Sequence, residues 1–79
     1  MIEYKDLNDI LKHFGFSVQS FAAFYGFSRY YIVYRKRRKK LLDFQMKKLL
    51  YDFISEKTGL NNAQISFEIE AVLQKKAPN

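Results

Sequence analysis

The sequence contains no cysteine and no tryptophan, and it has one histidine, one proline and three glycines in 79 residues. Without cysteine the chain can form neither a disulfide framework nor a thiolate metal site. No apolar stretch reaches the ~20 residues that a membrane span requires, and the first residues lack the basic start and apolar run of a signal peptide. We therefore expect a cytoplasmic protein with no membrane association and no cofactor.

The patterns of common catalytic sites are missing as well. His13 is the one histidine, the carboxylates are scattered, and the sequence has no Ser-His-Asp set and no phosphate-binding glycine loop. A lone histidine near a helix end is more consistent with capping or exposure than with metal binding. The sequence therefore predicts no catalytic residue, no metal site and no enzyme activity.

Positive charge, in contrast, is gathered in one quarter of the chain. Residues 29–48 hold nine of the 14 lysines and arginines and a single acid, so this stretch carries a formal charge of +8. The residues before it hold two lysines against three acids, and those after it three lysines against four acids, which makes each flank −1. Such a basic stretch in a small chain favours a polyanionic partner, of which nucleic acid is the commonest.

Apolar residues recur at the i, i+3, i+4 spacing of a helix along most of the chain. Glycines can end three of these segments, and serine or asparagine residues can cap three of them. The sequence predicts one domain over residues 1–79 with an all-α fold and a frayed end at residues 76–79. The five expected helices cover residues 3–14, 18–25, 29–37, 41–57 and 62–73.

Two of these segments could instead be strands. Residues 30–34 are aromatic and β-branched, and residues 65–70 alternate apolar and polar side chains, so the two segments could even pair. Each segment follows a suitable helix cap, and no hairpin turn lies nearby, which favours helices. An α+β fold stays open as the alternative.

Residues 17–37 have the order of a helix-turn-helix motif, with a short helix, a glycine-centred turn and a second helix that leads into the basic run. Ala22 is small where the two helices would cross, and Gly26 permits a left-handed turn conformation. Phe27 would fill the turn and Ile32 would face inward. The alternative is two helices that are merely short, but the adjacent charge favours a DNA-binding motif.

Residues 21–32 resemble the lambda-repressor-like helix-turn-helix family of the Xre and Cro type. Four positions match the family pattern around the turn glycine: Ala22, Phe27, Ser28 and Ile32. Arg35 stands where the family usually has an apolar residue, so Tyr34 could take that core role. Val18 replaces the glutamine that often opens the family's second helix, and the phosphate contact of that glutamine does not carry over.

A closer likeness, over residues 7–72, is to the N-terminal domain of phage anti-CRISPR autorepressors. The stretches that carry it are Lys-His-Phe at 12–14, Tyr-Gly-Phe-Ser at 25–28, Thr-Gly-Leu at 58–60 and Phe-Glu-Ile-Glu at 67–70. In that family the domain is a dimeric DNA-binding repressor, and a separate C-terminal domain carries the main nuclease inhibition. The resemblance implies a free-standing phage or mobile-element repressor that binds a palindromic operator as a homodimer. The alternatives are a small inhibitor that docks on a nuclease or another acidic partner, and an RNA-binding protein.

The family's recognition helix implies contacts with base edges from Ser28, Arg29, Tyr30 and Tyr34. Arg29 is the strongest candidate, because a guanidinium can donate two hydrogen bonds to guanine O6 and N7. A tyrosine can pack on a thymine methyl or bond a phosphate. The alternative is that the tyrosines at 30, 31 and 34 hold the helix to the core, and we expect this of at least one of them.

The six consecutive cations that follow cannot all face one groove and carry no pattern that reads sequence. We expect them to bind phosphates and set affinity rather than specificity. The predicted phosphate contacts are Ser17, Arg35, Lys36, Arg37, Arg38, Lys39 and Lys40. The alternative is a solvated, flexible charge run.

The last helix, about residues 62–75, has more apolar surface than we expect one small domain to cover. Folding at this size buries only about 60% of the surface of the unfolded chain, so a second copy would add stability. We expect a homodimer whose interface contains Ile65, Phe67, Ile69, Val72 and Leu73.

Overall fold

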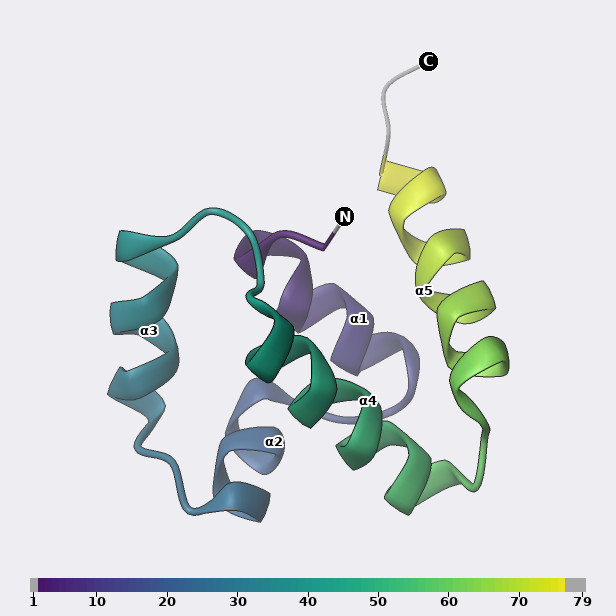
Figure 1. Ribbon diagram of the computed structural model, residues 1–79, viewed down its shortest axis with the longest axis horizontal. Helices are drawn as coiled ribbons and strands as arrows, with labels where there is room; N and C mark the ends of the chain where they lie inside the picture. Colours follow the sequence, from purple (N-terminus) through teal and green to yellow (C-terminus); the bar gives the residue numbers. More distant parts are fainter. Residues whose placement is uncertain (1, 77–79) are drawn as a thin grey trace.

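The computed structural model describes residues 2–76 (Figure 1). Its elements are a short 3-10 helix, η1 (Tyr4–Asp6), and the helices α1 (Leu7–His13), α2 (Val18–Tyr25), α3 (Arg29–Arg38), α4 (Phe44–Thr58) and α5 (Asn62–Lys76). Within residues 2–76 the one piece of β pairing is an isolated bridge between Glu3 and Leu41. The prediction of an all-α fold is confirmed. The α+β alternative is wrong, because residues 30–34 and 65–70 both lie in helices.

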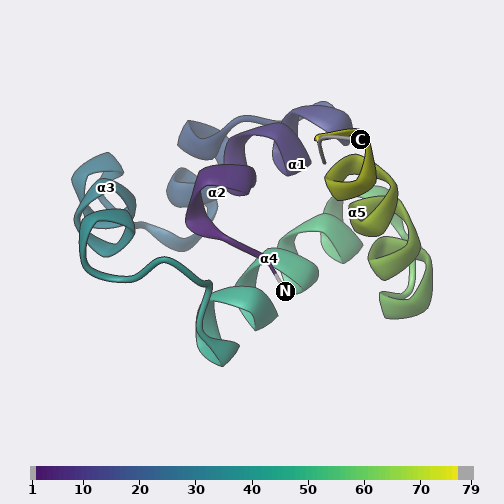
Figure 2. The same ribbon diagram turned by 90° about the horizontal axis from the view of Figure 1, so that it is seen from above.

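Four of the helices enclose the core (Figure 2). α1 packs on α2 and α5, and α4 packs on α2 and α5. Phe53 lies at the centre, where its ring meets the rings of Phe16, Phe21 and Phe24 edge to face at 5.2–5.4 Å between centroids. The Tyr25 hydroxyl donates a 2.6 Å hydrogen bond to the Leu49 carbonyl and so ties α2 to α4. None of the described helices is long and apolar enough to cross a bilayer.

The helix ends follow from local hydrogen bonds. Ser17 caps α2, since its hydroxyl accepts from the Ser20 N–H at 3.0 Å, and α5 begins with a reciprocal pair in which Asn61 and Gln64 each accept from the other's backbone N–H at 2.8 and 2.9 Å. The fourth helix begins three residues later than predicted. Asp43 is its N-cap and accepts from the Met46 N–H at 2.8 Å.

The end of α5 also differs from the prediction. We expected the helix to stop at about residue 73 and Lys76 to fray, but the helix continues through Lys76. The Lys76 ammonium reaches back to η1 and α1, where it lies 2.6 Å from an Asp6 carboxylate oxygen and 2.8 Å from one of Asp9. Asp6 is the one buried charged residue among the described residues, and this contact supplies its partner. Residues 77–79, also expected to fray, lie outside the described residues.

Candidate functional site

The turn between α2 and α3 has the local geometry that the sequence predicted. Gly26 ends α2 in the left-handed conformation, with φ of 75°, which a residue with a Cβ atom adopts with strain. The Phe27 N–H returns to the Ala22 carbonyl at 2.8 Å, and Ala22 is buried at the crossing. Ser28 then caps α3 by accepting from the Tyr30 N–H at 3.0 Å. The turn therefore fixes where α3 starts and the direction in which it leaves.

The inner side of α3 holds the helix to the body through few contacts. Ile32 is buried, as expected. The Tyr31 ring stacks on Phe27 with 4.8 Å between centroids, which confirms that at least one tyrosine anchors this helix. Tyr34 does not take the core role, since it is exposed.

Arg35 faces the body of the protein as well. Its guanidinium bonds the carboxylate of Asp43, and its Nε donates to the Tyr4 hydroxyl at 3.4 Å. The predicted phosphate contact is thus engaged, in the free chain, in holding α3 to η1 and to the start of α4. An arginine can do this at a site expected to be apolar because its stem packs while its head reaches an acid.

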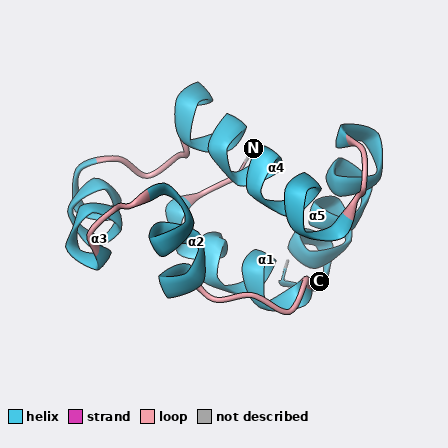
Figure 3. Ribbon diagram, turned by 90° about the horizontal axis from the view of Figure 1, so that it is seen from below, coloured by secondary structure: helices cyan, strands magenta, loops and turns pink. Residues whose placement is uncertain are grey.

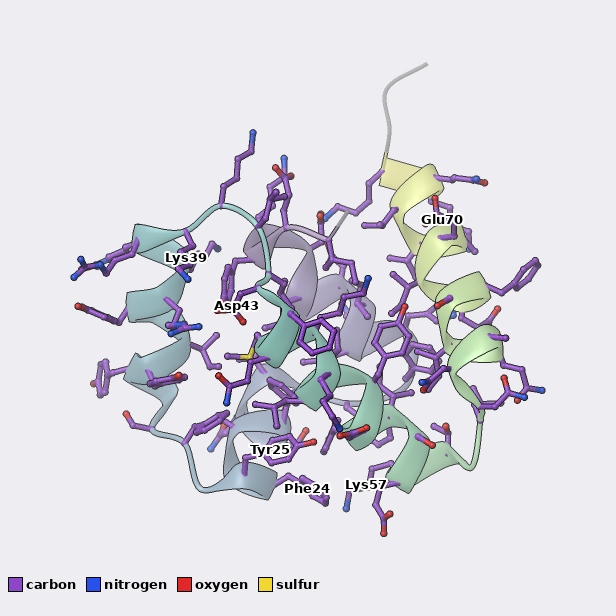
Figure 4. The ribbon with its side chains drawn as sticks, viewed as in Figure 1. Phe24, Tyr25, Lys39, Asp43, Lys57 and Glu70 are labelled. Atoms are coloured by element: carbon purple, nitrogen blue, oxygen red, sulfur yellow. The ribbon has the colours of Figure 1, made fainter. Side chains whose placement is uncertain are left out.

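Asp43 is the centre of this contact. Figure 4 shows Asp43 beside Lys39 where α3 gives way to α4, and the Lys39 ammonium lies 3.5 Å from the carboxylate. The pKa of Asp43 is held below its ordinary value, first by the hydrogen bond from the Met46 backbone N–H and then by the charges of Arg35 and Lys39. The carboxylate is therefore charged at neutral pH and keeps the end of α3 in place.

The outer side of α3 carries a row of side chains turned to solvent. Tyr30, Val33 and Tyr34 are 81%, 41% and 55% exposed, and together with Arg37 they line a shallow hollow. Their spacing is i, i+3, i+4 and i+7, so they form one face of the helix. We call these four residues the outer stripe. Apolar surface gathered on an exposed helix face is a common mark of a binding surface.

Free cations lie within the outer stripe and beside it. Among the described carboxylates, none lies within ion-pair distance of Lys36, Arg37 or Arg38, whereas Lys39 and Lys40 contact Asp43 and Glu3 at the surface. Such surface pairs are worth at most about 1 kcal/mol, so these lysines can also exchange their partner for a phosphate. Arg38 lies over the Tyr34 ring, with its guanidinium carbon 5.3 Å from the centroid, and donates to the phenol oxygen.

The structure brings some of the predicted DNA-contacting residues together on one face and not others. Tyr30 and Tyr34 share the outer stripe, while the Ser28 and Ser17 hydroxyls serve as helix caps. Arg29 begins α3, but its side chain lies outside the described residues. Val33 was not among the contacts predicted from the sequence, although the helical spacing of residues 30, 33, 34 and 37 places it on the same face as the two tyrosines.

We expected a dimer because the last helix has more apolar surface than one small domain would cover, and this reason is wrong. Ile65, Ile69 and Val72 are buried within a single chain, where α5 packs on α1 and α4, and Leu73 packs against the same core. Their apolar stripe is therefore already covered. Of the predicted interface residues Phe67 is the exposed one, at 72%, and it lines a small hollow with Leu60 and Ala63. The homodimer itself stays a prediction.

The arrangement can bind anions and flat or methyl-bearing groups along α3. Among residues 2–76, no three side chains of the metal-ligating types lie together. His13 contacts Glu68 at 3.3 Å across α1 and α5, far along the chain from the outer stripe. Comparisons with protein-family models, with curated proteins and with solved structures gave no match for this chain.

Proposed function

We propose that this chain binds duplex DNA in a sequence-specific manner by placing α3 in the major groove. The observation that carries the proposal is the outer stripe of Tyr30, Val33, Tyr34 and Arg37, an exposed face next to Lys36 and Arg38, which contact none of the described carboxylates. A helix with its side chains is about 10–12 Å across, and the major groove of B-form DNA is about 12 Å wide. The dimensions and the charge both suit this partner.

The position of α3 supports the same reading. Figure 1 and Figure 3 place α3 at one side of the molecule, opposite α5, where it packs on α2 and leaves its outer face accessible along its length. The outer stripe would face the base edges. Lys36, Arg38 and the loop lysines after them would reach the phosphates on the groove walls, which gives affinity without sequence information.

The biological role that we propose is repression of transcription, in a phage or another mobile element, by a homodimer on a palindromic operator. The resemblance of residues 21–32 to lambda-repressor-like proteins, and of residues 7–72 to anti-CRISPR autorepressor domains, supports this part. The α2–α3 pair would then be the helix-turn-helix motif. Two copies of α3 would enter successive major grooves about 34 Å apart.

Selection from a library of random duplexes tests the proposal. We expect an enriched motif, and a specific affinity at least about a thousandfold above that for random DNA at physiological salt. The same motif as an RNA duplex should bind weakly, because the deep, narrow major groove of A-form RNA does not admit a helix. Equal binding to all duplexes, or a preference for RNA, would contradict the proposal.

A pair of matched variants locates the surface. Tyr30→Ser removes an aromatic ring from the outer stripe, and Phe44→Ser removes a ring of similar exposure, 83%, from the start of α4. We expect the first variant to lose preference for the selected motif and the second to keep it. Equal losses would place the DNA on α4 as well, and a loss confined to Phe44→Ser would remove α3 from the interface.

A further inference from the structure

We infer that α3 recognises thymine through its C5-methyl group, with Val33 as the central contact. This inference rests on the proposed DNA binding and names the base that the outer stripe selects.

The chemistry of α3 restricts which bases it can read. Its ten residues, Arg-Tyr-Tyr-Ile-Val-Tyr-Arg-Lys-Arg-Arg, include no asparagine, glutamine, aspartate or glutamate. The paired hydrogen bonds that asparagine and glutamine make with adenine are therefore unavailable, and so is the carboxylate contact with cytosine. Two modes remain, which are a cation on guanine and an apolar contact on the thymine methyl group.

The shape of the outer face suits the second mode. Val33 and Tyr34 lie about one helical turn after Tyr30 on the same face, and their side chains line one hollow together with that of Arg37. Valine is β-branched and has one strongly preferred rotamer in a helix, so its two methyl groups are held in place. A methyl group that projects from a base into the major groove can therefore meet an apolar side chain in this hollow that is already ordered.

The neighbouring contact fixes one wall of the hollow. The Arg38 guanidinium lies 5.3 Å from the centre of the Tyr34 ring and donates a hydrogen bond to its hydroxyl. Arg38 is thus a positioning residue in addition to any phosphate contact. A ring that is held before binding loses less rotamer freedom when the base arrives.

The experiment replaces thymines in the selected duplex, one at a time, by deoxyuridine. Deoxyuridine keeps every hydrogen-bonding group of thymine and lacks the methyl. We expect affinity to fall about fourfold at one or two thymines in each half-site, the change that corresponds to one buried methyl group. Placing 5-methylcytosine opposite guanine at the same position should bind more tightly than cytosine there by a similar factor.

Variants of Val33 then identify the residue. Val33→Ala should bind the thymine and deoxyuridine duplexes with affinities that differ by less than twofold, and Val33→Thr, which keeps the branched shape and one of the two methyl groups, should retain part of the difference. Lys75→Gln, on α5 and exposed, should keep the wild-type ratio. Arg38→Gln should reduce the ratio without abolishing it, because Tyr34 would remain but would no longer be held.

The outcomes separate this inference from the proposal on which it rests. A clear preferred motif whose affinity is insensitive to every deoxyuridine replacement would overturn the methyl contact and leave sequence-specific DNA binding intact. A methyl effect that persists unchanged in both Val33 variants would overturn the role of Val33. The absence of any preferred duplex would overturn the proposed function, and the inference with it.

Discussion

The guanidinium of Arg35, near the end of α3, bonds the carboxylate of Asp43, which at the same time accepts the capping hydrogen bond from Met46 at the start of α4. One carboxylate therefore links the orientation of α3 to the first turn of α4. The link matters because Ile32 is the one buried residue among the described side chains of α3. Because so little apolar surface holds α3, its orientation relative to the other helices depends on its polar contacts.

Substitutions at Asp43 should separate its two roles. Asp43→Asn keeps a good N-cap acceptor and removes the charge that Arg35 and Lys39 contact, whereas Asp43→Ala removes both. We expect the free energy of unfolding of Asp43→Ala to be about 1 kcal/mol lower than that of Asp43→Asn. Urea denaturation of both variants measures this difference. Equal stabilities of the two variants would mean that the cap contributes nothing measurable.

Acid should weaken the protein through the same residue. The pKa of Asp43 lies below its ordinary value of 3.8 in the folded chain, so the folded state binds fewer protons than the unfolded state between the two pKa values. The contribution of Asp43 to stability is fully present above about pH 3.8 and is lost as the pH falls through the folded-state pKa. Denaturation curves from pH 7 to 2 should show a shallower acid loss for Asp43→Asn than for the wild type. Parallel curves would show that another carboxylate causes the loss.

An aspartate on the buried face of α5 should destabilise the fold, whereas an aspartate on its exposed face should not. Ile69 is 2% exposed, so Ile69→Asp buries an unpaired carboxylate and should cost about 3–5 kcal/mol, enough to unfold much of a marginally stable domain. Circular dichroism should show the loss of helix.

Phe67→Asp should leave the fold intact, because Phe67 is exposed. If a homodimer forms through this face, sedimentation should then change from dimer to monomer in this variant and not in Glu70→Gln, which alters an exposed residue of the same helix. A wild-type chain that sediments as a monomer at high micromolar concentration would contradict the dimer prediction.

Salt dependence should reveal the cations beside the outer stripe. Each neutralised phosphate steepens the fall of log K with log salt by about 0.9. Replacing Lys36 and Arg38 by glutamine should flatten the slope for random DNA by up to about 2 per protomer. The matched control, Lys12→Gln with Lys75→Gln, removes the same charge from α1 and α5 and should leave the slope nearly unchanged. Equal flattening in both double variants would mean that net charge, and not contact, sets the slope.

The local features of the fold were predictable because their signals lie within a few residues. Ser17, Gly26 and Ser28 cap or end their helices as the sequence indicated. The start of α4 was placed too early because Leu41 and Leu42 extend its apolar pattern. In the structure this stretch pairs instead with the N-terminal residues, and the Leu42 N–H donates to the Ile2 carbonyl at 2.9 Å. No local pattern reports a contact between segments so far apart in the chain.

The candidate site was predictable in outline for the same reason. Helical spacing identifies which residues share a face, but it does not say what covers that face. Ile65, Ile69 and Val72 form a regular stripe that faces the core, whereas Tyr30, Val33 and Tyr34 form one that faces solvent. The inward turn of Arg35 depends on Asp43 across a loop, and only the packed structure reveals it.

The ion contacts between Lys76 and the first helical turns have a consequence for how the chain is made. The contact of Lys76 with Asp6 joins residues 70 positions apart, and the same pairing of α1 with α5 covers apolar side chains of both helices. During synthesis at about 5–20 residues per second, part of the apolar face of α1 waits roughly 4–14 s for α5 to leave the ribosome. The apolar face of α1 is therefore open to association with other chains and with chaperones during that interval, until α5 can pack on it.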